Sequence, residues 1–168
     1  MKQMMMIAAV LTAMVPGAAL AGGNHAGGHG GHGEAASMEI GEPGEESKVN
    51  RAVEITMREK DDGGMVFEPS TLSISEGETI RLKFTNEGEL DHEFVMDVRE
   101  GILEHKALME KFPEMEHADP NAIKLAPGAA GEIIWTFAQA GDFDFACLIP
   151  GHYESGMKGR ISVTHGNH

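Results

Sequence analysis

The chain has 168 residues, with 27 acidic against 13 basic side chains and a net charge of −14 at pH 7. This balance disfavours nucleic acid and anionic membranes as partners, since both repel negative charge. It suits a cation or a partner protein with a basic patch, or simply keeps the protein soluble. The length fits one domain with its own hydrophobic core, which we expect to be a monomer.

Residues 1–21 predict a cleavable secretory signal peptide. Lys2 supplies a positive start, an apolar stretch too short to span a bilayer follows, and small residues precede a cleavage site after Ala21. We therefore expect export, with the bacterial periplasm as the compartment. No later segment has an apolar run long enough to cross a bilayer, so we expect no membrane insertion.

Residues 22–48 are rich in glycine and histidine and then acidic, with almost no bulky apolar side chains. Such a segment cannot offset the entropy of ordering, so we predict a disordered tail. Its histidines either remain solvated or wrap a weakly bound copper or zinc ion; they are His25, His29 and His32.

From Val49 the pattern is that of short β-strands. Residues 51–59 alternate, with Val53, Ile55 and Met57 on one side. A short extended piece follows Gly64, and further strand patterns cover residues 72–75, 79–85, 92–98, 131–138, 142–147 and 159–165. Seven or eight short strands joined by glycine-containing turns predict an all-β Greek-key sandwich over residues 49–168. We assign four large side chains to its packing: Met57, Met65, Met96 and Trp135.

A single insertion, residues 101–121, interrupts the strands. Leu103 to Lys111 has helical spacing, with Leu108 and Phe112 four residues apart, and Pro113 stops the helix. The insertion also carries soft metal ligands, which either hold a second, looser copper ion or, for the methionines, pack on the sandwich. These residues are His105, Met109, Met115 and His117.

The stretch "ACLIPGHYESGM" contains the only cysteine of the chain, Cys147. Without an internal disulfide partner, the thiol is buried and inert, joined to another molecule, or a metal ligand. His152 follows five residues later and Met157 ten residues later. Thiolate, imidazole and a weak thioether form the donor set of copper electron-transfer sites. Structural zinc is a weaker alternative, because methionine is a poor zinc ligand.

Such a copper site needs a second imidazole, and we expect it from His92. This residue begins a predicted strand and lies 55 residues before Cys147. A β-sandwich can bring the start of one strand beside the loop that joins its last two strands. That loop carries the other three candidate ligands.

These motifs together resemble the cupredoxins, the mononuclear type 1 blue or green copper proteins. The resemblance covers residues 49–164 and rests on "FEPSTLSISEGETIRLKFTNEG", "DHEF" and "FACLIPGHYESGM". It implies one copper ion held by two imidazoles, a thiolate and an axial thioether, from His92, His152, Cys147 and Met157 respectively. Many cupredoxins have asparagine after the first histidine, whereas this chain has Glu93, which cannot donate a hydrogen bond when ionised.

The histidine-rich tail, "DHEFVMD" and the Met/His insertion more narrowly resemble the CopI-type periplasmic cupredoxins linked to copper tolerance. This implies copper binding and Cu(I)/Cu(II) chemistry in copper homeostasis, with a redox or copper-trafficking protein as partner. The alternative is a soluble periplasmic electron carrier between redox enzymes, and a third hypothesis is a metal-free adhesive sandwich. The ligand set implies no open coordination position, so we expect no enzymatic turnover.

Overall fold

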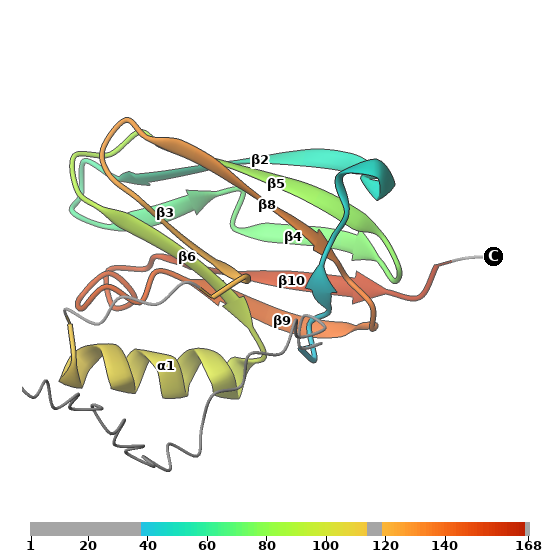
Figure 1. The fold of residues 1–168 in the computed structure, drawn as a ribbon. Helices are drawn as coiled ribbons and strands as arrows, with labels where there is room; N and C mark the ends of the chain where they lie inside the picture. The colour runs from blue at the N-terminus through green and yellow to red at the C-terminus, as the bar shows by residue number, and fades with distance from the viewer. Residues whose placement is uncertain (1–37, 114–118, 167–168) are drawn as a thin grey trace, which may run out of the picture. The chain divides into compact units, whose positions relative to one another are not determined.

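Alternating apolar side chains build two five-stranded β-sheets that form two layers (Figure 1). The computed structural model describes residues 38–113 and 119–166, and everything below concerns these residues. The first sheet has the order β1-β8-β5-β2-β3. Its strands are β1 (Glu42–Pro43), β2 (Arg51–Glu59), β3 (Met65–Glu68), β5 (Thr79–Asn86) and β8 (Ala130–Thr136), and the short 3-10 helix η1 (Glu46–Lys48) lies between β1 and β2.

The second sheet has the order β4-β10-β9-β6-β7. Its strands are β4 (Thr71–Ser75), β6 (His92–Asp97), β7 (Ala122–Leu125), β9 (Gly141–Ala146) and β10 (Lys158–Thr164). Two pairs are parallel, β2 with β5 and β4 with β10, and the remaining pairs are antiparallel. The predicted all-β sandwich is therefore confirmed.

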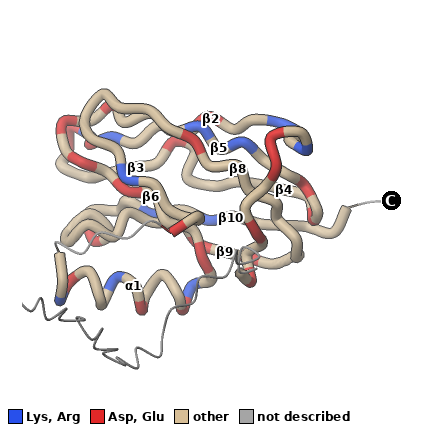
Figure 2. The backbone as a smooth tube through the Cα atoms, viewed as in Figure 1, with Lys and Arg blue, Asp and Glu red and all other residues tan. Residues whose placement is uncertain are grey.

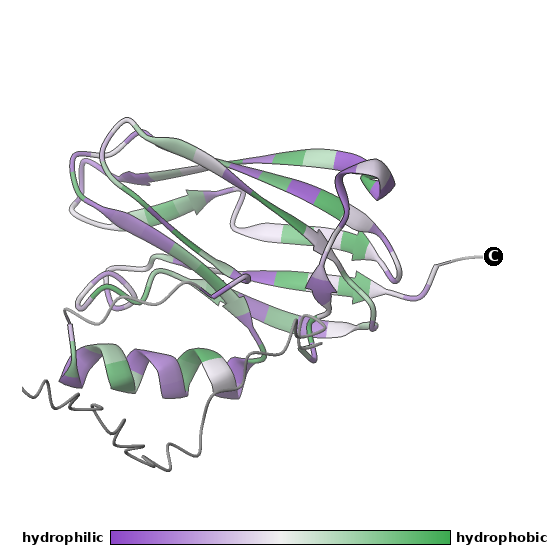
Figure 3. Ribbon diagram, in the orientation of Figure 1, coloured by the Kyte–Doolittle hydropathy of each residue, from purple (hydrophilic) through white to green (hydrophobic). Residues whose placement is uncertain are grey.

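The core lies between the two sheets and is rich in aromatic residues. Phe67 from the first sheet packs edge-to-face on Phe94 and Phe145 of the second, with ring centroids 5.7 and 5.2 Å apart. Figure 3 shows the alternation of apolar and polar residues along the strands that produces this arrangement. The packing predicted for the four large side chains is also confirmed: Met57, Met96 and Trp135 are fully buried, and Met65 packs against the core.

Two strands were not predicted from the sequence. β7 directly follows the expected insertion, and β1 lies inside the segment that we expected to be a disordered tail. Both are short, four residues and two residues, so neither gives a legible alternating pattern. β7 matters for the site because it pairs with β6, with Leu125 opposite His92.

The expected tail boundary at residue 48 is wrong for residues 38–48. Ile40 is fully buried in the core, and the Trp135 indole N–H donates a hydrogen bond to its carbonyl oxygen at 3.2 Å. Gly41 then turns the chain with φ of 128°, and a Cβ there would lie 2.0 Å from the Thr136 carbonyl oxygen. A buried isoleucine, a close backbone approach and the pairing of β1 with β8 therefore hold a segment whose average composition is polar. Residues 1–37, including the predicted signal peptide, lie outside the described residues.

The predicted helix is present and longer than expected. α1 (Arg99–Lys111) starts four residues earlier than expected and buries Ile102 and Met109 against the second sheet, beside Val95 of β6. Leu108 and Phe112, whose spacing indicated the helix, are 46% and 58% exposed. The described part of the chain contains no helix with the length and apolar character needed to cross a bilayer.

Replacing the buried side chain of the N-terminal segment tests its role in the fold. We expect Ile40→Ala to lower the free energy of unfolding by about 2–5 kcal/mol, because it leaves a cavity in the core. Denaturant unfolding of the metal-free protein measures this. The control is Leu103→Ala, at a position that is 46% exposed, which should change stability by less than about 0.5 kcal/mol. Equal effects of both variants would show that residues 38–48 add nothing to the sandwich.

Candidate metal centre

Strand pairing brings the first predicted ligand to the other three. His92 is the first residue of β6, and Cys147 directly follows the last residue of β9. These strands are antiparallel neighbours, with Val95 opposite Ala146. The start of β6 therefore lies at the end of β9, and the Glu93 backbone N–H donates to the Cys147 sulfur at 3.4 Å.

The loop between β9 and β10 closes on itself and carries the remaining candidate ligands. The Cys147 N–H donates to the Met157 carbonyl oxygen at 3.0 Å, and the Met157 N–H donates to the His152 carbonyl oxygen at 3.1 Å. A further bond from the His152 N–H to the Ile149 carbonyl oxygen, at 3.0 Å, tightens the turn. The spacing of five and ten residues that was visible in the sequence thus becomes one hydrogen-bonded loop.

His92, Cys147 and His152 form a compact cluster. One ligand atom from each lies within 4.8 Å of those of the other two. The Cys147 sulfur is 3.3 Å from His152 Nδ1, and the two imidazole centroids are 5.3 Å apart. Among residues 38–113 and 119–166, this is the one group of three or more His, Cys, Asp or Glu side chains close enough to hold a metal ion.

Burial shows that this cluster fits a metal ion. His92 and Cys147 are fully buried and His152 is 8% exposed. Neither ring nitrogen of His92, Nδ1 or Nε2, has a hydrogen-bond partner in the described structure. An unsatisfied buried nitrogen is costly, and a metal ion bound at that nitrogen would remove the cost. The donor set, two imidazole nitrogens and a thiol sulfur, is the one that copper prefers in trigonal sites.

The protonation of these groups also suits a metal site. Burial lowers the pKa of both His92 and His152, so the imidazoles stay neutral and keep a lone pair for the metal. Burial raises the pKa of the Cys147 thiol to about 12, against the smaller opposite effect of N–H donors from Glu93 and Ile149. The thiol therefore keeps its proton until a metal displaces it.

The fourth predicted ligand, Met157, is fully buried next to Cys147 and His152 in the loop. Its role as axial ligand stays a prediction. Of the predicted secondary ligands, Met109 is buried in the contact of α1 with the sheet, which favours packing, and His105 is half-buried on the same helix. The remaining secondary candidates lie outside the described residues: His25, His29, His32, Met115 and His117.

One residue at the site was missed by sequence reasoning. Glu59, the last residue of β2, places its carboxylate Oε1 2.9 Å from His92 Nε2. The separation is short enough for a hydrogen bond, although the ring N–H is not aimed directly at that oxygen. Burial opposes ionisation of Glu59, but backbone N–H donors from Glu89 and Leu90 and the nearby imidazole outweigh it and lower its pKa. Nothing in the sequence marked this glutamate among its acidic neighbours.

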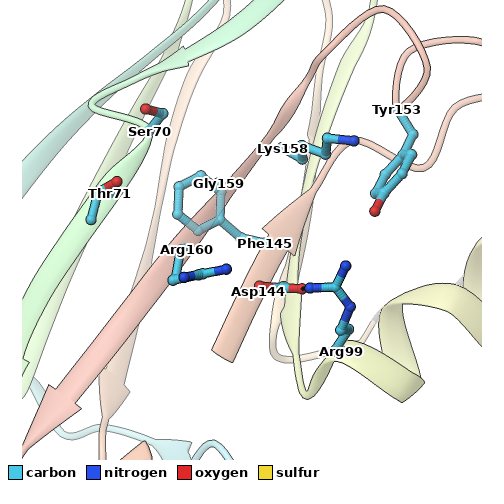
Figure 4. A pocket seen from close by; sticks show the side chains of 9 residues that line it. All are labelled: Ser70, Thr71, Arg99, Asp144, Phe145, Tyr153, Lys158, Gly159 and Arg160. Carbon is cyan, nitrogen blue, oxygen red and sulfur yellow. Dashed lines mark ion pairs between the residues drawn. The ribbon is translucent and has the colours of Figure 1, made fainter. Parts of the chain in front are cut away.

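A separate pocket of about 480 Å³ has a lining that includes residues of β4, β9, β10 and the ligand loop but none of the four predicted ligands (Figure 4). Lys158 Nζ lies 4.3 Å from the centre of the Tyr153 ring, and Arg99 pairs with Asp144 at 3.6 Å. The lining residues are Ser70, Thr71, Arg99, Asp144, Phe145, Tyr153, Lys158, Gly159 and Arg160. The pocket is thus locally basic on an acidic protein.

Comparison with known proteins places this fold and site in one family. Residues 53–164 match the copper binding proteins of the plastocyanin/azurin family. The copper-resistant cuproprotein CopI of Rubrivivax gelatinosus is 42% identical over 144 residues, which are 85% of this chain and 85% of that protein. CopI of Pseudomonas aeruginosa is 30% identical over 161 residues, covering 79% of this chain and 84% of the relative.

Among solved structures, reduced auracyanin from Roseiflexus castenholzii shares the fold, with a TM-score of 0.56 at 24% identity over 69% of this chain and 98% of that one. The chain belongs to the plastocyanin/azurin family of copper-binding proteins. It is a cupredoxin that binds copper, and the cluster of His92, Cys147 and His152 fits a type 1 copper site. The resemblance drawn from the sequence, including the CopI type, is confirmed.

The raised thiol pKa predicts how copper affinity depends on pH. Between about pH 7 and 9 the imidazoles are already neutral, so binding should expel one proton from Cys147 and the apparent Cu(II) affinity should rise about tenfold per pH unit. Competition with a chelator of known pH dependence measures the affinity. Calorimetry in buffers of different ionisation enthalpy counts the protons. An affinity independent of pH over this range would contradict a protonated thiol in the metal-free protein.

Proposed function

We propose that the protein is a periplasmic copper-tolerance factor that binds one copper ion and passes single electrons through it. The single observation that carries this proposal is the buried cluster of one thiol and two neutral imidazoles. Two supports come from relatives: those at 42% and 30% identity are both named copper-resistant cuproproteins. The predicted signal peptide supports export from the cytoplasm.

The side chains around the site have two tasks. His92, Cys147 and His152 would supply the strong donors, and the buried thioether of Met157 would supply a weak one. The bound metal supplies a Cu(I)/Cu(II) couple that needs little rearrangement of its ligands. With four donors the metal would have no open position for a substrate, so we propose that the protein is not an enzyme.

The charge distribution supports a cationic ligand and a partner with a basic patch. β2 and β5 end, and β6 begins, at the end of the sandwich that carries the ligand loop. Figure 2 shows acidic residues gathered in the connections at this end. In the β2–β3 and β5–β6 connections they are Asp61, Asp62, Glu87, Glu89 and Asp91. Negative charge near the site raises the local concentration of copper ions.

One observation favours the second candidate, an electron carrier between redox enzymes. Of the four predicted ligands, His152 is the one with measurable exposure, at 8%, whereas the other three are fully buried. An imidazole edge that reaches the surface gives electrons a short route to a docked partner. The two functions use the same copper site. They differ in the physiological process that the site serves, which is copper tolerance in one case and electron transfer between redox enzymes in the other.

Loss of the thiolate should abolish both colour and tolerance. Wild-type protein loaded with Cu(II) should be blue or green through sulfur-to-copper charge transfer, and Cys147→Ser should be colourless. In a strain lacking the gene, wild type and the control His165→Ala, at an 84% exposed histidine, should restore growth in copper, whereas Cys147→Ser should not. A colourless wild-type protein would overturn the type 1 site. If the strain lacking the gene instead tolerates copper normally but loses respiration at low copper, the protein is an electron carrier.

Replacing the proposed axial ligand tests the role of Met157. We expect Met157→Leu to keep the strong charge-transfer colour, because the three strong donors remain, and to shift the Cu(I)/Cu(II) preference about tenfold toward Cu(I), a rise of about 59 mV. The control, Met96→Leu, changes an equally buried methionine of β6 and should leave the potential unchanged. Both swaps conserve volume and should cost less than about 1.5 kcal/mol of stability. Identical potentials would show that Met157 only packs.

A further inference from the structure

The carboxylate of Glu59 joins the two sheets at the metal site. Glu59 ends β2 in the first sheet, whereas His92 begins β6 in the second. The Glu59 Oε1 lies 2.9 Å from His92 Nε2, which leaves the other ring nitrogen, Nδ1, without a carboxylate contact in the described structure. The side chain of His92 is fully buried and that of Glu59 is 25% exposed. A partly exposed carboxylate thus contacts the buried ring of a candidate ligand.

The β5–β6 connection folds around this carboxylate. The Glu89 N–H donates to Oε2 at 2.8 Å, and the Leu90 N–H donates to Oε1 at 3.2 Å. Two backbone N–H groups therefore bind the carboxylate, and the imidazole Nε2 lies within contact distance of it. Gly88 permits this approach, because a Cβ at that position would lie 2.4 Å from Oε2.

A buried asparagine fixes the same connection from the other side. Asn86 is fully buried and its Nδ2 donates to the carbonyl oxygens of Leu90 and Leu125, at 2.8 and 2.9 Å. Its Oδ1 accepts the Gly88 N–H at 2.9 Å. The backbone donors that face Glu59 are thus held in place independently of Glu59. The carboxylate thus lies at a position whose hydrogen-bond donors are fixed by other contacts. A glutamine amide there would point its own N–H group at one of the two backbone donors, which are those of Glu89 and Leu90.

We propose that Glu59 is a positioning residue for copper, keeping the proton of His92 on Nε2, turning Nδ1 toward the metal, and favouring Cu(II) over Cu(I) by its negative charge. This inference rests on the copper site of the proposed function and deepens it. A carboxylate on the remote nitrogen of a histidine ligand fixes the tautomer and raises the basicity of the nitrogen that binds metal. A fixed negative charge near the metal also stabilises the more positive oxidation state.

The test compares Glu59→Gln with Glu54→Gln. Both replace a glutamate of β2 by its amide and change the net charge equally, but Glu54 is 73% exposed and pairs with Lys83. Chelator competition measures affinity for Cu(II) and Cu(I), and voltammetry measures the potential. We expect Glu59→Gln to weaken Cu(II) binding 10–100-fold. The factor by which Cu(I) binding weakens should be at least ten times smaller, so the reduction potential should rise by about 59 mV or more. Glu54→Gln should keep both affinities within twofold.

The alternative is that Glu59 only caps the connection. In that case Glu59→Gln lowers the melting temperature while the ratio of Cu(II) to Cu(I) affinity matches that of Glu54→Gln, and the proposal is overturned. Nitrogen-15 NMR of the wild-type protein gives a second test that does not depend on a folded variant. His92 should carry its proton on Nε2 in the metal-free protein, and a proton on Nδ1 would overturn the proposal.

These outcomes also separate this inference from the proposed function. If wild type forms the coloured copper site but Glu59→Gln behaves like Glu54→Gln, only the role of Glu59 fails. If the wild-type protein forms no coloured copper site, the proposed type 1 site itself is wrong, and the role of Glu59 falls with it. Copper tolerance in cells is a third readout, and its absence in a protein with a normal site would affect the physiological role alone.

Discussion

The antiparallel pairing of β6 with β9 is the constraint on which the metal site depends. It brings His92, 55 residues earlier in the chain, to the loop that begins at Cys147, and it aims the Glu93 N–H at the sulfur. A slip of one residue would turn the side chains of β6 to the opposite face. The register is held because Phe94 and Phe145 must face the core, where they pack with centroids 5.1 Å apart. The hydrophobic core therefore positions the ligands.

Burial has opposite consequences for the two kinds of ligand. It keeps the imidazoles of His92 and His152 neutral and ready to bind, while it holds the proton on Cys147 until a metal replaces it. The cost of an unsatisfied buried nitrogen is borne by the metal-free protein and removed on binding. Copper binding and stability of the fold are thus linked through the same few atoms. Glu59 is the exception, since its carboxylate is ionised and partly open to water while it contacts the buried ring.

Sequence reasoning succeeded where the signal was local. The alternation of β2, β5 and β8 predicted strands that the structure contains, and the spacing of Cys147, His152 and Met157 predicted one loop. It failed where a few contacts outweighed composition. Ile40 is buried in a segment that is polar on average, and Leu108 and Phe112 face outward although their spacing suits a helix core. Glu59 carried no pattern of its own, because its role comes from a neighbour in the other sheet.

The sequence by itself determined the strand pattern, the donor types and the copper chemistry that those donors favour, because these depend on residue identity and short spacing. Only the tertiary structure decided that His92 lies beside the loop ligands and which glutamate contacts its ring. These features depend on pairing between strands that are distant along the chain, and on burial that no local window of sequence records.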